Sequence, residues 1–193
     1  MAQFPVNLNL AGRRVLVVGA GRIALRKTEQ LLVADAVVTV VAPEVHDGFA
    51  GLPVTVVRDR FEARHLEGQR LVITATGVRD VDQSIFDLCE ERGIWVNSAD
   101  DPDRCTFTLP AVVRRGDLLL AVSTGGSSPA LSSYLRRRLE SVFGETFADV
   151  VDDLSRARDR FHAEGISTET VDWAPIIDET LARHGVSFVE VVS

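Results

Sequence analysis

Short apolar runs alternate with amphipathic segments along the first half of the chain. Residues 15–18 form a continuous apolar run that ends at a glycine, which is typical of a buried parallel strand. Residues 23–33 carry apolar side chains at helical spacing, and residues 37–41 form a second apolar run that Pro43 ends. Together these segments predict one strand–helix–strand unit.

The same alternation continues toward the middle of the chain. We predict strands at residues 54–57, 71–74 and 94–96, with a helix from about residue 80 to 92 that Gly93 ends. Strands that alternate with helices favour a mostly parallel sheet with helices on both faces. The pattern therefore predicts an α/β fold of the Rossmann type, a doubly wound parallel sheet.

The pattern changes after Pro110. Residues 111–123 predict two strands joined by a tight turn, and Pro129 then opens a helix that reaches about residue 143. Further helical segments follow at about residues 145–164 and 171–184. We therefore expect a Rossmann domain over residues 1–113, a small α+β segment over 114–144, and a helical C-terminal region over 145–193.

Composition and charge exclude several classes of protein. Hydrophobic residues make up 46% of the 193 residues, as in a folded domain, and no apolar run approaches the length of a membrane span. The net charge of −7 argues against a nucleic-acid partner. The four histidines are scattered without ligand spacing, so we expect no bound metal. The N-terminus does not resemble a secretory signal, and we expect a cytoplasmic protein.

The stretch GAGRIA, from Gly19 to Ala24, matches the G-x-G-x-x-A dinucleotide motif. It lies between a predicted strand and a predicted helix, where the motif places a pyrophosphate on the N-terminus of the helix. A turn that only satisfies packing is the alternative. In NAD enzymes an acidic residue at the end of the second strand binds the ribose, and Glu44 lies slightly beyond that position in the sequence. Arg22, beside the pyrophosphate, would also suit NADP, so both cofactors stay open. The cofactor-binding candidates are Gly19, Gly21, Arg22, Ile23, Pro43, Glu44 and Thr76.

Several polar side chains follow the predicted strand at residues 94–96. Ligands of such folds bind outside the carboxyl ends of the strands, so a titratable group there is a candidate for chemistry. A solvated turn is the alternative interpretation of the same loop. The residues concerned are Asn97, Asp100, Asp101 and Asp103.

Three stretches together resemble one family, the precorrin-2 dehydrogenases of siroheme synthesis, many of which are also sirohydrochlorin ferrochelatases. VVGAGRIALRK resembles the family's glycine motif, and TVVAP resembles its second strand. NSADDPDRCTFTLPAVVRRGDLLLAVSTGGSSPALSSYLRRRLE resembles its Asn-x-x-Asp-x-Pro loop and its Ser-Thr-Gly-Gly-x-Ser-Pro motif. The resemblance covers most of residues 5–145.

The resemblance implies an enzyme that oxidises precorrin-2 to sirohydrochlorin with NAD as the hydride acceptor. It also implies that Asp100 is the catalytic carboxylate, that residues 114–144 form a homodimer and bind substrate, and that Fe²⁺ or Co²⁺ is a further substrate wherever chelation is retained. A carboxylate in that position is suited to act as a general base.

A substrate with eight acidic side arms needs local cations and free N–H groups in a chain of this charge. We expect these in the loop that carries the Ser-Thr-Gly-Gly-x-Ser-Pro motif, although the serines of this loop are equally suited to cap the following helix. The substrate-binding candidates are Asn97, Arg114, Thr124, Gly125, Gly126, Ser127 and Ser128. Two alternatives stay open: a dehydrogenase for another reduced substrate, and a non-catalytic dimeric module that binds tetrapyrrole or nucleotide.

Overall fold

The computed structural model describes residues 3–99 and 101–187, which form two compact units that divide after Leu109. The predicted Rossmann boundary at residue 113 lies inside a strand of the second unit. The hairpin belongs to the second unit as a whole because its two strands pair with each other. The finer division of the chain into three functional regions stays a prediction.

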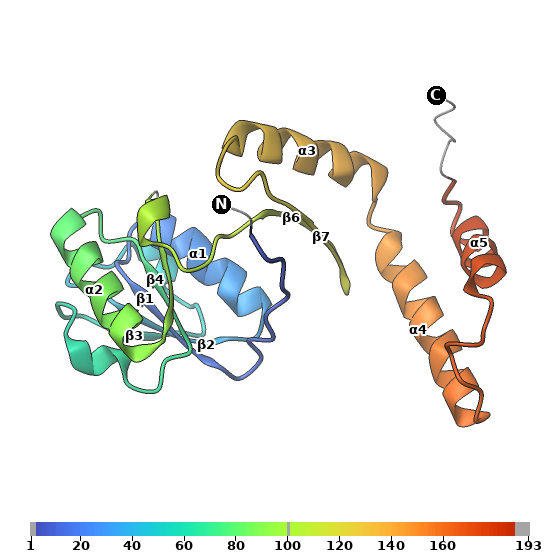
Figure 1. Cartoon of the computed structure of the whole chain (residues 1–193), viewed down its shortest axis with the longest axis horizontal. Helices are drawn as coiled ribbons and strands as arrows, with labels where there is room; N and C mark the ends of the chain where they lie inside the picture. Colours follow the sequence, from blue (N-terminus) through green and yellow to red (C-terminus); the bar gives the residue numbers. More distant parts are fainter. Residues whose placement is uncertain (1–2, 100, 188–193) are drawn as a thin grey trace. The chain divides into compact units, whose positions relative to one another are not determined.

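The first unit is an α/β domain with the predicted element order (Figure 1). Its strands and helices are β1 (Arg14–Val18), α1 (Arg22–Val33), β2 (Val37–Val41), β3 (Thr55–Val57), β4 (Leu71–Thr74), α2 (Arg79–Arg92) and β5 (Trp95–Ser98). Short 3-10 turns lie at Asp47–Phe49, Ala63–Leu66 and Pro102–Arg104. The sheet has five strands in the order β3-β2-β1-β4-β5, and every pair is parallel. This confirms the predicted doubly wound sheet.

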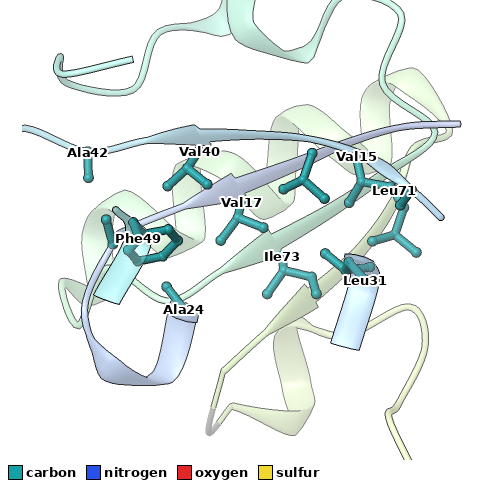
Figure 2. Packing of buried hydrophobic residues seen from close by; sticks show 12 residues of the cluster. Val15, Val17, Ala24, Leu31, Val40, Ala42, Phe49, Leu71 and Ile73 are labelled. Carbon is teal, nitrogen blue, oxygen red and sulfur yellow. The ribbon is translucent and has the colours of Figure 1, made fainter. Parts of the chain in front are cut away.

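The two helices of the first unit cover opposite faces of the sheet. Strand side chains alternate between the two faces, so Val15 and Val17 pack with Ala24 of α1, as the core in Figure 2 shows. Leu16 packs instead with Ile85 of α2 in a second buried cluster. β1 lies in the middle of the sheet and its run from residue 15 to 18 is almost completely buried, which explains why the sequence there is continuously apolar.

The second unit begins with the antiparallel hairpin of β6 (Ala111–Arg115) and β7 (Leu118–Val122). Gly116 occupies the turn with a φ of 54°, a left-handed conformation that glycine adopts without strain. The helices α3 (Pro129–Val142), α4 (Phe147–Ala163) and α5 (Trp173–Arg183) follow, and α4 packs against α5. Within the described residues, no helix has the length and apolar character needed to cross a membrane.

Candidate functional site

Gly19 forms the turn that leaves β1 at the carboxyl edge of the sheet. Its N–H donates to the carbonyl of Val41 at the end of β2, at 2.9 Å. Its φ is 99°, and a Cβ at this position would lie 2.3 Å from the carbonyl oxygen of Ala75, just beyond β4. Glycine is therefore required here for two independent reasons, the backbone conformation and the close approach of another segment.

Gly21 plays a different part at the N-terminus of α1. It is the N-cap residue, and a Cβ built on it would meet no atom within 4 Å, so the space beside it is open. No side chain caps this helix and its first turn holds no acidic residue. Within the described chain, no hydrogen bond satisfies the backbone N–H groups of Arg22, Ile23 or Ala24. An open helix N-terminus with free N–H groups fits the pyrophosphate of a dinucleotide.

The other cofactor candidates lie at the ends of neighbouring strands. Pro43 and Glu44 follow β2 and are exposed, and Thr76 follows β4. The Thr76 hydroxyl donates to Asp82 Oδ1 at 2.8 Å and accepts the N–H of Val78 at 3.0 Å, so it fixes the start of α2. Because β2, β1 and β4 are adjacent, the structure brings all the cofactor candidates to one edge of the sheet.

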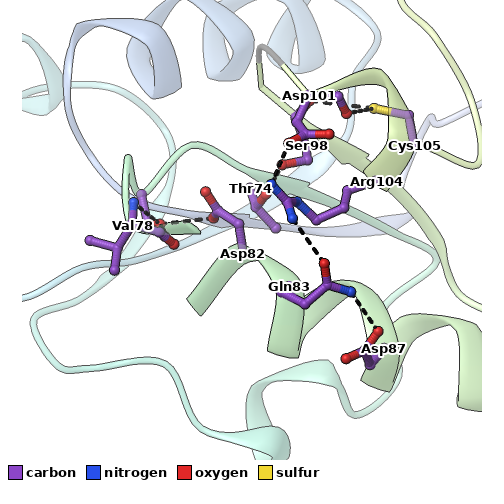
Figure 3. Close-up of polar contacts among 10 residues, drawn as sticks. Thr74, Val78, Asp82, Gln83, Asp87, Ser98, Asp101, Arg104 and Cys105 are labelled. Carbon is purple, nitrogen blue, oxygen red and sulfur yellow. Dashed lines mark hydrogen bonds and ion pairs between the residues drawn. The ribbon is translucent and has the colours of Figure 1, made fainter. Parts of the chain in front are cut away.

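The proposed catalytic residue, Asp100, lies outside the described residues. The loop that follows it is held to α2 by a buried cation. Arg104 is 8% exposed, pairs with Asp101, and donates to Gln83 Oε1 at 2.8 Å (Figure 3). Gln83 in turn donates to Asp87 at 2.8 Å. A chain of charged and amide groups therefore fixes this loop on the helix.

Two further side chains close the same loop from the strand side. The thiol of Cys105 lies 3.1 Å from the carbonyl oxygen of Asp101, and burial raises its pKa, so it remains a protonated donor. The amide of Asn97 is buried and donates to the carbonyl of Phe107 at 2.9 Å. The structure thus gives Asn97 a role inside the fold, and its predicted contact with substrate stays untested.

A cavity of about 300 Å³ opens at the carboxyl ends of β4 and β5. Its walls combine two cations with two carboxylates, a suitable lining for a polar ligand and for proton transfer. Asp82, Asp101 and Arg104 already have partners within the protein, whereas Arg79 on α2 has no ion pair among the described residues. The lining residues are Gly77, Arg79, Asp82, Ser98, Ala99, Asp101 and Arg104.

The predicted substrate loop of the second unit forms its own network. Thr124 Oγ1 accepts the N–H of Ser128 at 3.0 Å, and the Ser128 hydroxyl accepts the N–H of Leu131 at 3.3 Å. The cap that we considered as an alternative is therefore present. Gly125 and Gly126 both have positive φ, at 62° and 85°, with no atom within 4 Å of a built Cβ.

Two further predicted positions lie in the second unit. Arg114 lies exposed on β6, and Ser127 lies exposed in the loop, where its N–H donates to the carbonyl of Thr124 at 3.1 Å. In the part of the chain that the structure describes, no group of three or more acidic, histidine or cysteine side chains is placed to hold a metal ion.

The sequence interpretation missed the residues that shape the loop at residues 101–105, which we call the acidic loop. Arg104 and Gln83 lie far apart in sequence and on different elements, and they meet only because α2 packs beside β5. Arg104 is in a stretch rich in charge, where a buried cation has no distinct pattern. The proline at position 102, which opens the short turn that ends at Arg104, is a local signal for that turn.

Two family models match the chain. One, described as putative NAD(P)-binding, matches residues 6–111, and the other, described as the central part of a sirohaem biosynthesis protein, matches residues 115–141. The match to the first covers more than half of the chain. The border between the two matches falls in the hairpin that opens the second unit.

Several curated relatives are named siroheme synthase. Siroheme synthase 2 of Aeromonas salmonicida is 39% identical over 162 residues, which are 83% of this chain and 34% of the relative. Siroheme synthase of Tolumonas auensis is 43% identical over 144 residues, which are 74% of this chain and 31% of the relative. The chain thus spans about a third of the length of these relatives.

A solved structure resembles nearly the whole chain. It is titled SirC, precorrin-2 dehydrogenase, and the TM-score is 0.74 with 28% sequence identity. The match covers 95% of this chain and 99% of that one. The likeness therefore includes both units and not the Rossmann domain alone.

Proposed function

The chain belongs to the family of NAD(P)-binding proteins whose model matches residues 6–111, and on that premise we propose that it is an NAD-dependent precorrin-2 dehydrogenase. The reaction is the oxidation of precorrin-2 to sirohydrochlorin in siroheme synthesis. The observation that carries this proposal is the likeness, over 95% of the chain, to a solved precorrin-2 dehydrogenase. The siroheme synthase relatives point to the same pathway.

The carboxyl edge of the sheet, which holds the cofactor candidates and which we call the cofactor edge, fits NAD. Gly21 and the free N–H groups of the first turn of α1 would hold the pyrophosphate, because both the open space and the helix dipole favour an anion there. Glu44, exposed after β2, would face the adenosine ribose. The backbone at Thr76 would border the nicotinamide side of the site. When bound, NAD supplies the hydride acceptor.

Asp100 is the proposed general base. Loss of a hydride from the reduced macrocycle must be balanced by loss of a proton, and a carboxylate is suited to accept it. The support for this position is local: Ala99 lines the cavity, and Asp101 is fixed by Arg104 and by the Cys105 thiol. Described neighbours on both sides therefore lie at or beside the cavity.

The carboxylate arms of the substrate require cations and free N–H groups. We assign this role to Arg114 and to the loop from Thr124 to Ser128. The hydroxyls of Thr124 and Ser128 are engaged within the loop, and the N–H of Gly125 donates to Ser123 Oγ at 3.2 Å, so the N–H of Gly126 is the more available donor. Asn97 and Ser127 would contribute less to substrate binding, because Asn97 is buried and the Ser127 N–H is already bonded.

A homodimer is the proposed assembly, formed through α3. Four apolar side chains at helical spacing lie exposed on this helix, which is unusual for a solvated helix face. They are Leu131, Tyr134, Leu135 and Val142, exposed by 47%, 52%, 38% and 55%. A cytoplasmic location, and Fe²⁺ or Co²⁺ as a substrate for chelation, stay predictions of the same proposal.

The decisive experiment is anaerobic incubation of the protein with precorrin-2 and NAD, with NADH formation and the macrocycle spectrum as readouts. The wild type should produce NADH, and Asp100→Asn should reduce the rate by about 10²- to 10⁴-fold if Asp100 is the base. Asp103→Asn is the matched control, because this residue is exposed in the same loop and should keep near wild-type activity. A wild type that binds both ligands without forming NADH would favour the non-catalytic module.

Chelation is tested separately. Sirohydrochlorin and Co²⁺ are mixed with the protein, and the rate of metal insertion is compared with a protein-free control. Equal rates would exclude this activity and would leave the dehydrogenase proposal unaffected.

A further inference from the structure

A second cavity lies at the amino-terminal edge of the same sheet, at the opposite ends of β1 and β4 from the cofactor edge. Its volume is about 430 Å³, within the range of small-molecule sites. The cavity is formed by the residues that precede the two adjacent strands, and the N–H of Arg70 donates to the carbonyl of Arg14 at 2.9 Å. Its lining residues are Gly12, Arg13, Arg14, Gly68, Gln69 and Arg70.

The charge of this cavity is strongly one-sided. Arg13, Arg14 and Arg70 line it, and no carboxylate does. Among the residues that the structure describes, none of the three forms an ion pair, whereas Arg104 and Arg115 each do. Three guanidinium groups around one space repel each other unless an anion lies between them. Their planar forks are suited to oxyanions such as phosphate and carboxylate.

The backbone makes room for one of these cations. Gly68 has a φ of 70°, and a Cβ built on it would come within 3.2 Å of Arg14 Nη1. The guanidinium of Arg14 therefore lies directly over the glycine. A larger residue at position 68 would displace the cation from the wall of the cavity.

Gln69 also lines the cavity. Its side chain is only 8% exposed, and its Oε1 atom is buried without a hydrogen-bond partner. This oxygen has no accessible surface, so the guanidinium groups are the groups that a ligand in the cavity would contact.

We propose that this edge of the sheet is a binding site for a small oxyanion, with phosphate as its simplest form. The site is distinct from the cofactor edge, because the two lie at opposite ends of β1 and β4. The proposal does not depend on the dehydrogenase function.

The test is titration of isotopically labelled full-length protein with inorganic phosphate, followed by the amide resonances of Gly68 and Gln69. NAD is present at saturation, so that phosphate cannot occupy the N-terminus of α1. Phosphate should shift these resonances, and Arg70→Gln should weaken the affinity by about tenfold or more, as expected for loss of a charge-assisted contact. Arg58→Gln is the control, because Arg58 is exposed and does not line the cavity.

Two further titrations, with citrate and with chloride, identify the chemistry of the ligand. Citrate presents clustered carboxylates with a hydroxyl, and chloride at equal ionic strength reports simple screening. Saturable shifts with phosphate or citrate but not with chloride would support the site, and the tighter ligand identifies the preferred oxyanion. The proposal is overturned if Gly68 and Gln69 do not respond, or if Arg58→Gln weakens binding as much as Arg70→Gln.

Discussion

The two glycine-containing turns, each of which leads into a helix, differ in what they do with their hydrogen-bonding groups. At α1, Gly21 supplies no cap, and the N–H groups of Arg22, Ile23 and Ala24 have no partner within the described chain. At α3, the Ser128 hydroxyl caps the helix, and proline at the first position has no N–H to satisfy.

This difference separates a turn that leaves its N–H donors free from one that satisfies them within the chain. An uncapped helix N-terminus loses stability that a cap would provide, and an anionic ligand can supply it. The capped loop of the second unit has fewer free donors. If it binds substrate, it does so mainly through the N–H of Gly126, where φ is positive and the surrounding space is open, because the N–H of Gly125 already donates to Ser123 Oγ.

The largest expected effect is that of Gly19→Ala. Its Cβ would clash with the carbonyl of Ala75, and its φ of 99° is strained for alanine, so we expect a loss of about 3 kcal/mol in unfolding free energy and loss of NAD binding. Gly51→Ala is the control, because Gly51 has a similar φ of 83° with no atom near a built Cβ, and it should lose about 1 kcal/mol. Denaturant unfolding measures both, and equal losses would contradict the clash.

The second-largest expected effect is the loss of the ion pair between Arg104 and Asp101, compared with the loss of an ion pair in the second unit. Arg104→Gln leaves the partly buried carboxylate of Asp101 without its buried partner and should lower the unfolding free energy by about 2 kcal/mol. Arg136→Gln breaks a half-exposed pair with Glu140 on α3 and should cost less than about 0.5 kcal/mol. Urea denaturation of both variants provides the comparison, and a larger loss for Arg136→Gln would reverse it.

A pair of substitutions tests the two turns directly. Gly21→Ala meets open space, so stability should change by less than about 1 kcal/mol, while NAD affinity falls about tenfold because the Cβ lies where the pyrophosphate must approach. Ser128→Ala should lose about 1 kcal/mol of stability with unchanged NAD affinity. Calorimetric titration and thermal unfolding separate the two. The comparison fails if both variants change the same quantity.

The smallest effect concerns pH in the helical part of the second unit. Hydrogen bonds from His184 and Arg156 lower the pKa of Asp153 to about 2. The contact between α4 and α5 is therefore at full strength above the ordinary carboxyl pKa of 3.8 and weakens as pH falls toward 2. The fluorescence of Trp173, measured in a Trp95→Phe background, should follow this change. Asp153→Asn should abolish the pH dependence, and Asp159→Asn should retain it.

The fold was predictable because its signals are local. The buried run before Gly19 and the helical spacing after it predicted the first strand–helix unit, and the change of pattern after Pro110 predicted the hairpin. The predicted boundary at residue 113 lies a few residues from the division after Leu109, because the division depends on which strands pair and not on composition.

The site was predictable only in part. The glycine motif placed the cofactor edge because turn, strand and helix are adjacent in sequence. The contacts of Arg104 with Gln83 and of Asn97 with Phe107 join separate segments, and no local pattern marks them. Asn97 shows the consequence: its place at a strand end left a ligand contact and a turn role equally open, and only the structure adds the hydrogen bond from its amide to Phe107. Its contact with substrate stays a prediction.

The central claim is that the N-terminus of α1, and not the capped turn before α3, receives the cofactor. Titration of labelled protein with NAD tests it most directly, with the backbone amides followed one by one. The account predicts large, saturable shifts at Gly21, Arg22 and Ile23 and much smaller ones at Ser127 and Ser128. Saturable shifts confined to Ser127 and Ser128, with Gly21, Arg22 and Ile23 unchanged, would contradict it.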